Sequence, residues 1–196
     1  MRSCRRGQPS RPVASATSSR ADALKNSTSE RWQRADGREV AALYPRPPAL
    51  VPCSRHLRIE VFGRVLCDTC LSLRVLETYH PPTFYLPPDS VDASLLQHRP
   101  DRSFCEWKGV AHWFDLVIRL QGGREDRRDA AVWSYLEPTP AYQSLAGWYA
   151  VYPGRMDGCW IDDEPVTPQP GKYYGGWITA EVEGPFKGDP LHPHLI

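Results

Sequence analysis

The sequence predicts a mainly β protein: a single bent antiparallel β domain, folded into a sandwich or open barrel, with one or two short helices and a disordered N-terminal tail. Three observations predict it. Twenty prolines in 196 residues favour many short elements, because proline is excluded from helix interiors and central strands. Short apolar runs alternate with turn-forming residues along most of the chain. Strands and helices do not alternate, and no repeat of fixed period occurs.

Length and charge limit the classes of partner. A chain of 196 residues suits one domain of ordinary size. Its formal net charge of +1 provides no large basic field, so we expect no nucleic-acid partner. No window reaches the roughly 18 apolar residues of a membrane span, so we expect a soluble protein without a membrane partner.

The N-terminal segment differs in composition from the rest. Its first 21 residues hold five arginines, many serines and no acid. They also have too few large apolar side chains to order the chain. We expect a disordered tail over 1–36, a β domain over 37–188 and a C-terminal tail over 189–196. An organelle transit peptide has the same composition as the N-terminal segment. A start codon placed too far upstream is a further alternative.

Each expected element follows from a local pattern. Residues 56–62 alternate cleanly, with Leu57, Ile59 and Val61 on one face, and Gly63 turns this strand back into 64–69 as a hairpin. Further strands are expected at 71–78, 83–86, 110–120, 130–136, 148–153, 158–162 and 176–182. Two short helices are expected at 89–98 and 139–147, because each follows a capping residue and Gly147 closes the second.

Cysteines and acids do not form an evident metal site. The six cysteines are Cys4, Cys53, Cys67, Cys70, Cys105 and Cys159. They are not evenly spaced and no signal peptide precedes them, so we expect reduced thiols in a cytoplasmic protein. Cys67 and Cys70 would face opposite sides of a strand, and the acids at 162–164 fit a hairpin tip. We therefore expect no metal and no cofactor.

Aromatic side chains carry the functional argument, because the common phosphate-binding, dinucleotide-binding, metalloprotease and serine-hydrolase motifs are absent. A domain of this size rarely needs so many large rings in its core, so some should line a small-molecule pocket. The rings in or beside expected strands are Trp107, Trp113, Trp133, Trp148, Trp160 and Trp177, with Tyr85, Tyr135, Tyr149, Tyr152, Tyr173 and Tyr174. The polar residues nearest to them in sequence are Glu77, His80, Lys108, His112, Ser134 and Tyr135.

The segments RVLETYHPPTFYLPPDSV, CEWKGVAHWFDLVI, AAVWSY, WYAVYPGRMDGCW and YYGGWITAEVEGPFKG, in this order, resemble the family of the domain of unknown function 427. The resemblance covers about three quarters of the chain and implies a tent-like β fold, similar to Mss4-like exchange-factor chaperones, methionine sulfoxide reductase B and the cereblon ligand-binding domain. Relatives of that fold place a pocket against the sheet, and many bind zinc through two cysteine pairs that this chain lacks. The nucleotidyltransferase label of the family finds no Gly-Ser and Asp-x-Asp motif here.

We expect a pocket for an unidentified small molecule, with Glu77 and Lys108 as a charged pair. The expected ligand-binding residues are Glu77, Trp107, Lys108, Trp113, Trp133, Tyr135 and Trp177. An enzyme is the first alternative, with Glu77 as general base, Lys108 or Tyr135 stabilising negative charge, and His80 or His112 as proton shuttle. A protein-interaction module and a cysteine-based redox protein are further alternatives. The sequence leaves ligand and oligomeric state open.

Overall fold

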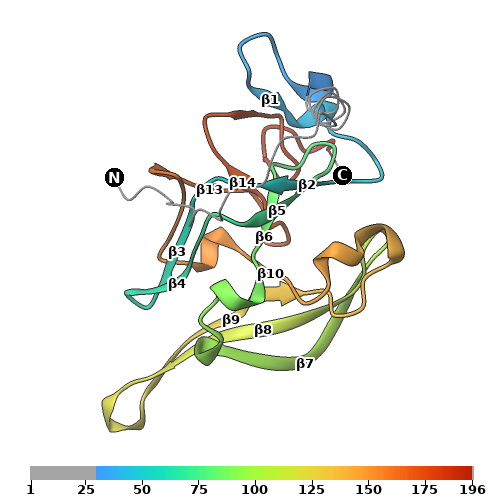
Figure 1. Ribbon diagram of the computed structural model, residues 1–196. Coiled ribbons are helices and arrows are strands. Elements are labelled where there is room, and N and C mark those ends of the chain that lie inside the picture. Colours follow the sequence, from blue (N-terminus) through green and yellow to red (C-terminus); the bar gives the residue numbers. More distant parts are fainter. Residues whose placement is uncertain (1–29, 196) are drawn as a thin grey trace, which may run out of the picture.

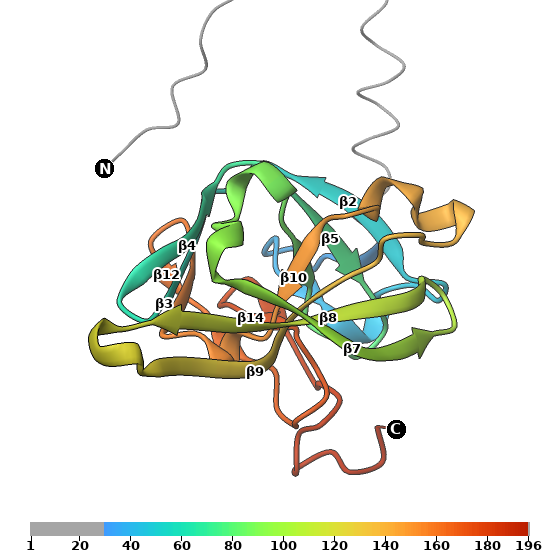
Figure 2. The ribbon, with the colours of Figure 1, turned by 90° about the horizontal axis from the view of Figure 1, so that it is seen from below.

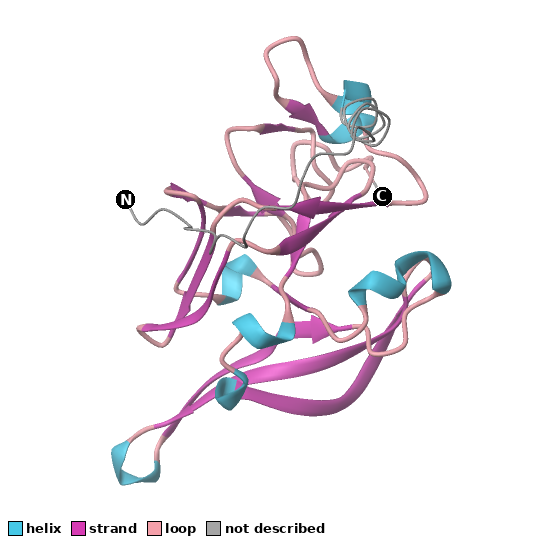
Figure 3. Ribbon diagram, viewed as in Figure 1, coloured by secondary structure: helices cyan, strands magenta, loops and turns pink. Residues whose placement is uncertain are grey.

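The computed structural model describes residues 30–195, and strands dominate this range (Figures 1 and 3). The strands are β1 (Glu39–Val40), β2 (Ala49–Cys53), β3 (Leu57–Val61), β4 (Arg64–Thr69), β5 (Ser72–Leu76), β6 (Thr83–Tyr85), β7 (Leu96–Cys105), β8 (Gly109–Arg119), β9 (Glu125–Ser134), β10 (Tyr149–Val151), β11 (Gly158–Ile161), β12 (Glu164–Pro165), β13 (Thr167–Pro168), β14 (Trp177–Ile178) and β15 (Val182–Glu183). The prediction of a mainly β protein is confirmed.

The helices are all short 3-10 turns. They are η1 (Glu30–Trp32), η2 (Ala41–Leu43), η3 (Pro88–Ser90), η4 (Ala93–Leu95), η5 (Gln121–Gly123), η6 (Pro140–Leu145) and η7 (Pro153–Arg155). The two predicted helices correspond to η3 with η4 and to η6, and both are shorter than expected. Within residues 30–195, no helix is long and apolar enough to cross a membrane.

A bent antiparallel sheet forms the frame of the molecule. Its two halves are separate sets of strands: β2, β5 and β6 form one half, and β10, β9, β8 and β7 form the other, each in this spatial order. Leu86 and Tyr149 join the two at their edges, because the Leu86 amide donates to the Tyr149 carbonyl at 2.7 Å and the Tyr149 amide donates back at 3.0 Å. The two sheets therefore diverge from a shared seam, and Figures 1 and 2 show them as separate layers beyond it.

A second sheet, in the order β12, β11, β3 and β4, covers one end of the bent sheet. Leu57, Ile59 and Val61 are fully buried beneath it, so the alternation predicted for 56–62 is confirmed. They pack with Phe114 and Val132 from β8 and β9. The remaining pairs are small: β1 lies parallel to β15, and β13 lies antiparallel to β14.

The ten-residue strand β7 was not predicted. Its side chains are mostly exposed because β7 is the edge strand of its sheet, so the sequence shows no alternation of apolar and polar residues. Pro100 interrupts it where the pairing with β8 shifts register, between His98 and Arg102. An edge position tolerates both features, because proline need not donate to a neighbour there.

The folded part begins before the predicted boundary at residue 37. Trp32 is only 5% exposed and packs edge-to-face on Tyr44, with ring centres 6.0 Å apart. Gln33 forms a β-bridge with Glu39. Trp32 therefore belongs to the core and anchors the segment before residue 37 to the domain, whereas the tail predicted for residues 1–29 lies outside the described range.

The cysteines only partly follow the prediction. Cys53, Cys67, Cys105 and Cys159 are free thiols, as expected. Cys70 is disulfide-bonded, which corrects the expectation of reduced thiols throughout. The prediction for Cys4 lies outside the described residues.

A buried carboxylate fixes the register of β8 against β9. Asp115 accepts hydrogen bonds from Arg99 at 2.8 Å and from the Ala130 amide at 2.7 Å, and it also pairs with Arg127. Burial raises the pKa of Asp115, but these hydrogen bonds lower it by more. The pKa of Asp115 therefore lies below its usual value. Asp115 lies in the irregularity between Phe114 and Leu116, and the carboxylate therefore holds the bulge that follows the tryptophan-bearing part of β8.

Candidate functional site

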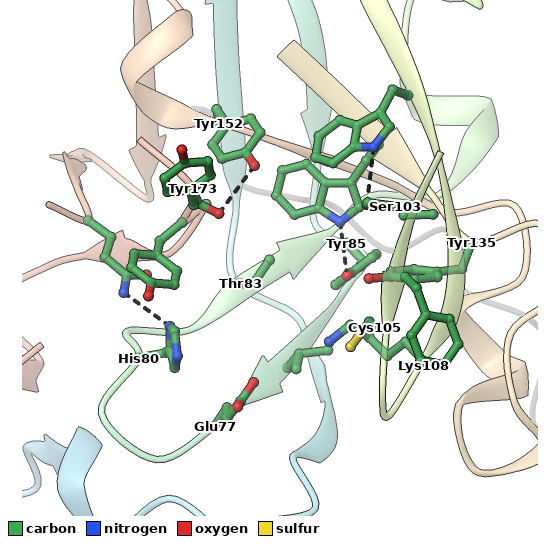
Figure 4. Close-up of a pocket in the computed structure, with 18 residues that line it drawn as sticks. Glu77, His80, Thr83, Tyr85, Ser103, Cys105, Lys108, Tyr135, Tyr152 and Tyr173 are labelled. Atoms are coloured by element: carbon green, nitrogen blue, oxygen red, sulfur yellow. Dashed lines mark hydrogen bonds between the residues drawn. The ribbon is translucent and has the colours of Figure 1, made fainter. Parts of the chain in front are cut away.

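A cavity of about 330 Å³ lies between the two halves of the bent sheet (Figure 4). The loops around residues 77–80 and 169–175 complete its wall. The lining residues are Val75, Glu77, His80, Thr83, Tyr85, Ser103, Phe104, Cys105, Lys108, Ala111, Trp113, Trp133, Tyr135, Tyr152, Gln169, Tyr173, Tyr174 and Gly175. Nine of these eighteen side chains are aromatic, counting His80, so flat ring surfaces make up much of the wall.

Trp133 is the centre of the aromatic wall. Its ring centre lies 5.8 Å from Trp113, 4.9 Å from Tyr152 and 6.3 Å from Tyr85. Trp113 and Trp133 are direct partners in the pairing of β8 with β9, which places both indoles on the same face of the sheet. Trp113 also stacks nearly parallel to Tyr152, with 8° between the ring planes.

Polar edges of these rings have partners within the site. Trp133 Nε1 donates to the Tyr85 hydroxyl at 3.2 Å, and Trp113 Nε1 donates to Ser103 Oγ at 3.1 Å. Burial of an indole N–H would be costly without such an acceptor. The two indoles are therefore held in place as part of the cavity wall.

Gly175 gives the chain its close approach to Trp133. A Cβ atom at this position would lie 2.2 Å from Cη2 of Trp133, far inside contact distance. The loop therefore packs its bare backbone against the indole, which no other residue could do without displacing the ring. The neighbouring Gly176 is equally confined, since its Cβ would lie 2.4 Å from Oε1 of Gln169.

Lys108 lies in the tight turn between β7 and β8. Cys105 pairs with Gly109, so only three residues form the turn, and Gly109 adopts a positive φ of 94° that suits glycine. Thr139 anchors the turn: its amide donates to the Lys108 carbonyl at 3.2 Å and its hydroxyl donates to the Trp107 carbonyl at 2.6 Å. This anchoring directs the Lys108 side chain into the cavity (Figure 4).

The ammonium group of Lys108 has few compensating contacts. Lys108 is only 8% exposed, yet no ion pair or hydrogen bond of its Nζ occurs within residues 30–195. In the same range, its ammonium group contacts the ring of Tyr135, whose centre lies 5.7 Å from Nζ. Glu77, its predicted partner, instead pairs with Arg46, with 2.8 Å between Oε1 and Nη2. The expected pair of Glu77 and Lys108 is therefore not formed.

His80 is held as a neutral imidazole on the wall. The Gln169 amide nitrogen donates to the Lys187 carbonyl at 3.0 Å and contacts His80 Nδ1 at 3.1 Å. Nδ1 is thus an acceptor, and the ring proton resides on Nε2. Burial lowers the pKa of His80 to about 4, against the raising effect of nearby Glu77. At neutral pH, His80 adds no charge to the cavity.

The tyrosine hydroxyls of the cavity remain protonated. Burial raises the pKa of Tyr135, and the neighbouring Tyr85 and Cys105 raise it further. Burial also raises the pKa of Tyr85. Both hydroxyls therefore act as hydrogen-bonding groups rather than bases at neutral pH. Within the described part of the chain, no hydrogen bond connects Glu77, Lys108 and Tyr135, the three groups of the enzymatic alternative.

Five of the predicted ligand-binding residues lie together in this cavity. They are Glu77, Lys108, Trp113, Trp133 and Tyr135. Trp107 packs against the same apolar cluster but does not line the cavity. Trp177 is fully buried against Phe84, with ring centres 5.0 Å apart, and borders a different cavity.

Several lining residues were not singled out from the sequence. Ser103 comes from the unpredicted strand β7, and Gln169 comes from a loop distant in the chain. The Gly175-Gly176 pair was the available signal, since paired glycines often mark a close approach of the backbone. His112 and Ser134, by contrast, were singled out but do not line the cavity.

The site does not contain an arrangement suited to a metal. Among residues 30–195, no three His, Cys, Asp or Glu side chains converge so that they could hold a metal ion.

A family model described as a domain of unknown function (DUF427) matches residues 49–162, more than half of the chain. The matched part runs from β2 through β11 and contains Lys108, Trp113 and Trp133. No curated protein matches this sequence.

Proposed function

The chain belongs to the DUF427 family, a domain of unknown function, and we propose that it binds a small planar molecule in the aromatic cavity. The convergence of aromatic side chains carries this proposal. Trp113, Trp133, Tyr85 and Tyr152 come from four separate parts of the chain and meet around one cavity. Its volume of about 330 Å³ lies near the lower end of the roughly 300–1,000 Å³ typical of ligand pockets.

Binding requires nothing more than these surfaces. A planar ligand that stacks on two or three of the rings would gain about 0.5–1.5 kcal/mol from each, beyond the gain from burying apolar surface. The wall is also preorganised, because Tyr85 and Ser103 hold the indole edges and little side-chain freedom is left to lose. Catalysis, in contrast, would need Glu77, Lys108 and Tyr135 within hydrogen-bond reach of one another.

An uncharged planar probe tests the proposal. We expect 2-naphthamide to shift the NMR signals of the Trp113 and Trp133 indole N–H groups and to leave that of Trp160 unchanged. Trp160 is a suitable internal control because it lies in β11 and does not line the cavity. Single Trp→Phe variants assign the three signals. The proposal fails if the probe moves the Trp160 signal alone or moves none of the three.

A further inference from the structure

We infer that the ligand of this cavity is a monoanion, an aromatic carboxylate whose charged group pairs with Lys108. This inference rests on the proposed function, because it assigns the chemical class of the molecule that enters the same cavity. Its starting point is the Lys108 ammonium, which has no ion pair or hydrogen bond among the described residues and approaches the open centre of the cavity in Figure 4.

Burial of Lys108 calls for a negative partner. Lysine side chains are almost never this buried without one, because an isolated ammonium group loses its hydration. The contact with the Tyr135 ring, at 5.7 Å, only partly replaces that hydration. A carboxylate in the cavity would supply both the opposite charge and a charge-assisted hydrogen bond.

The other charges around the cavity favour an anion over a cation. The negative charge of Glu77 is already balanced by Arg46, which binds it at 2.8 Å from outside the lining. Arg155 stacks over the Tyr152 ring at 4.5 Å and, within residues 30–195, hydrogen-bonds only carbonyl oxygens. His80 is neutral. A cationic ligand would therefore meet uncompensated positive charge.

The number of cations favours a carboxylate over a phosphate. Lys108 is the single cationic side chain among the residues that line the cavity, whereas a phosphate dianion is normally held by several donors or positive groups. The flat rings of Trp113 and Trp133 require the rest of the ligand to be planar. One or two fused aromatic rings bearing one carboxylate satisfy both conditions.

Three probes with the same ring test this class. We propose to measure the affinity of 2-naphthoate, 2-naphthamide and 2-naphthylmethylammonium for the full-length protein by isothermal titration calorimetry. The wild type should bind the carboxylate most tightly and the ammonium most weakly. Lys108→Met should weaken carboxylate binding by about 10- to 100-fold, which is the effect of losing a charged hydrogen bond. The affinity of this variant for the amide should stay within about threefold of the wild-type affinity.

Two further variants separate local charge from general attraction. Glu77→Gln removes a negative charge from the lining, so it should strengthen carboxylate binding and weaken ammonium binding. Lys172→Met removes an exposed lysine that does not line the cavity, so it should change neither the carboxylate affinity nor the ammonium affinity. Lys108→Met should keep or raise the melting temperature, because it removes a buried charge without a partner.

The outcomes distinguish the two proposals. Tighter binding of the ammonium than of the carboxylate, or equal carboxylate binding by wild type and Lys108→Met, overturns the anion inference while the binding function stands. Failure of all three probes to bind the wild type overturns the binding function and the inference with it. Should Lys108→Met not fold, the order of affinities in the wild type and its change in Glu77→Gln decide the question.

Discussion

His80 shows how a single half-buried side chain links stability to pH. In the unfolded chain, an imidazole of ordinary pKa, about 6.5, takes up a proton when the pH falls below this value. In the folded protein, burial lowers the pKa of His80 to about 4, so the ring stays neutral through the same range. The unfolded state then binds more protons than the folded state, and protonation favours unfolding between these two values.

Replacement of His80 should therefore flatten the pH dependence of stability. The folded wild type is expected to lose up to roughly 3 kcal/mol of unfolding free energy as the pH falls from about 6.5 to about 4, because the pKa differs by that interval. His80→Gln lacks the titrating ring and should lose less. Urea unfolding of both proteins at pH 7 and pH 4.5 measures the difference, and parallel losses would refute this role of His80.

At the scale of elements, the loop at 169–176 shapes the cavity through its backbone. Gln169 tethers it to the Lys187 carbonyl and to His80, and the Gly175 backbone lies against the Trp133 indole. The loop follows β13 in the chain, far from β9 in sequence, so its contact with Trp133 is purely tertiary.

Gly175→Ala should disturb the fold and the cavity together. Its Cβ would lie 2.2 Å from Trp133, and either the loop or the indole must move. We expect a loss of about 1–3 kcal/mol in unfolding free energy, typical of overpacking, together with weaker binding of 2-naphthamide.

Gly154→Ala provides the matched control for this variant. Gly154 is exposed, and an added Cβ would meet its nearest neighbour, Pro168, at an ordinary 3.5 Å. This variant should unfold at the same urea concentration as the wild type. Equal stability of the Gly175 and Gly154 variants would show that the contact with Trp133 does not constrain the loop.

For the whole molecule, the seam between Leu86 and Tyr149 defines where a ligand should act. The cavity lies between the halves that diverge from this seam, while the sheet of β12, β11, β3 and β4 packs on a separate apolar cluster. A ligand in the cavity should therefore bridge the two halves and restrain their separation, without tightening the second sheet directly.

Hydrogen exchange should reveal this division. With saturating 2-naphthamide, amides of β5, β6, the turn at 106–108 and the loop at 169–176 should exchange more slowly, by about tenfold where the ligand is present at ten times its Kd. Amides of β3, β4 and β11 that open only locally should exchange at unchanged rates. Protection confined to the second sheet would place the ligand elsewhere.

The strands could be predicted where one face is buried. Residues 57–61 alternate because Leu57, Ile59 and Val61 enter the core. β7 could not be predicted, since an exposed edge strand is under no pressure to alternate. Trp32 was missed for another reason: one buried ring in a polar segment carries no periodicity.

By itself, the sequence determined the β class, most strand positions and the excess of rings beside a few polar side chains, because these depend on local spacing and composition. Only the tertiary structure decided which rings share a cavity: Trp113 and Trp133 line it, whereas Trp177 is fully buried elsewhere. It also decided the charges, by pairing Glu77 with Arg46 and leaving Lys108 without an ion pair in the part of the chain that the structure describes. The physical reason is that burial and ion pairing depend on contacts between distant segments, which no local pattern encodes.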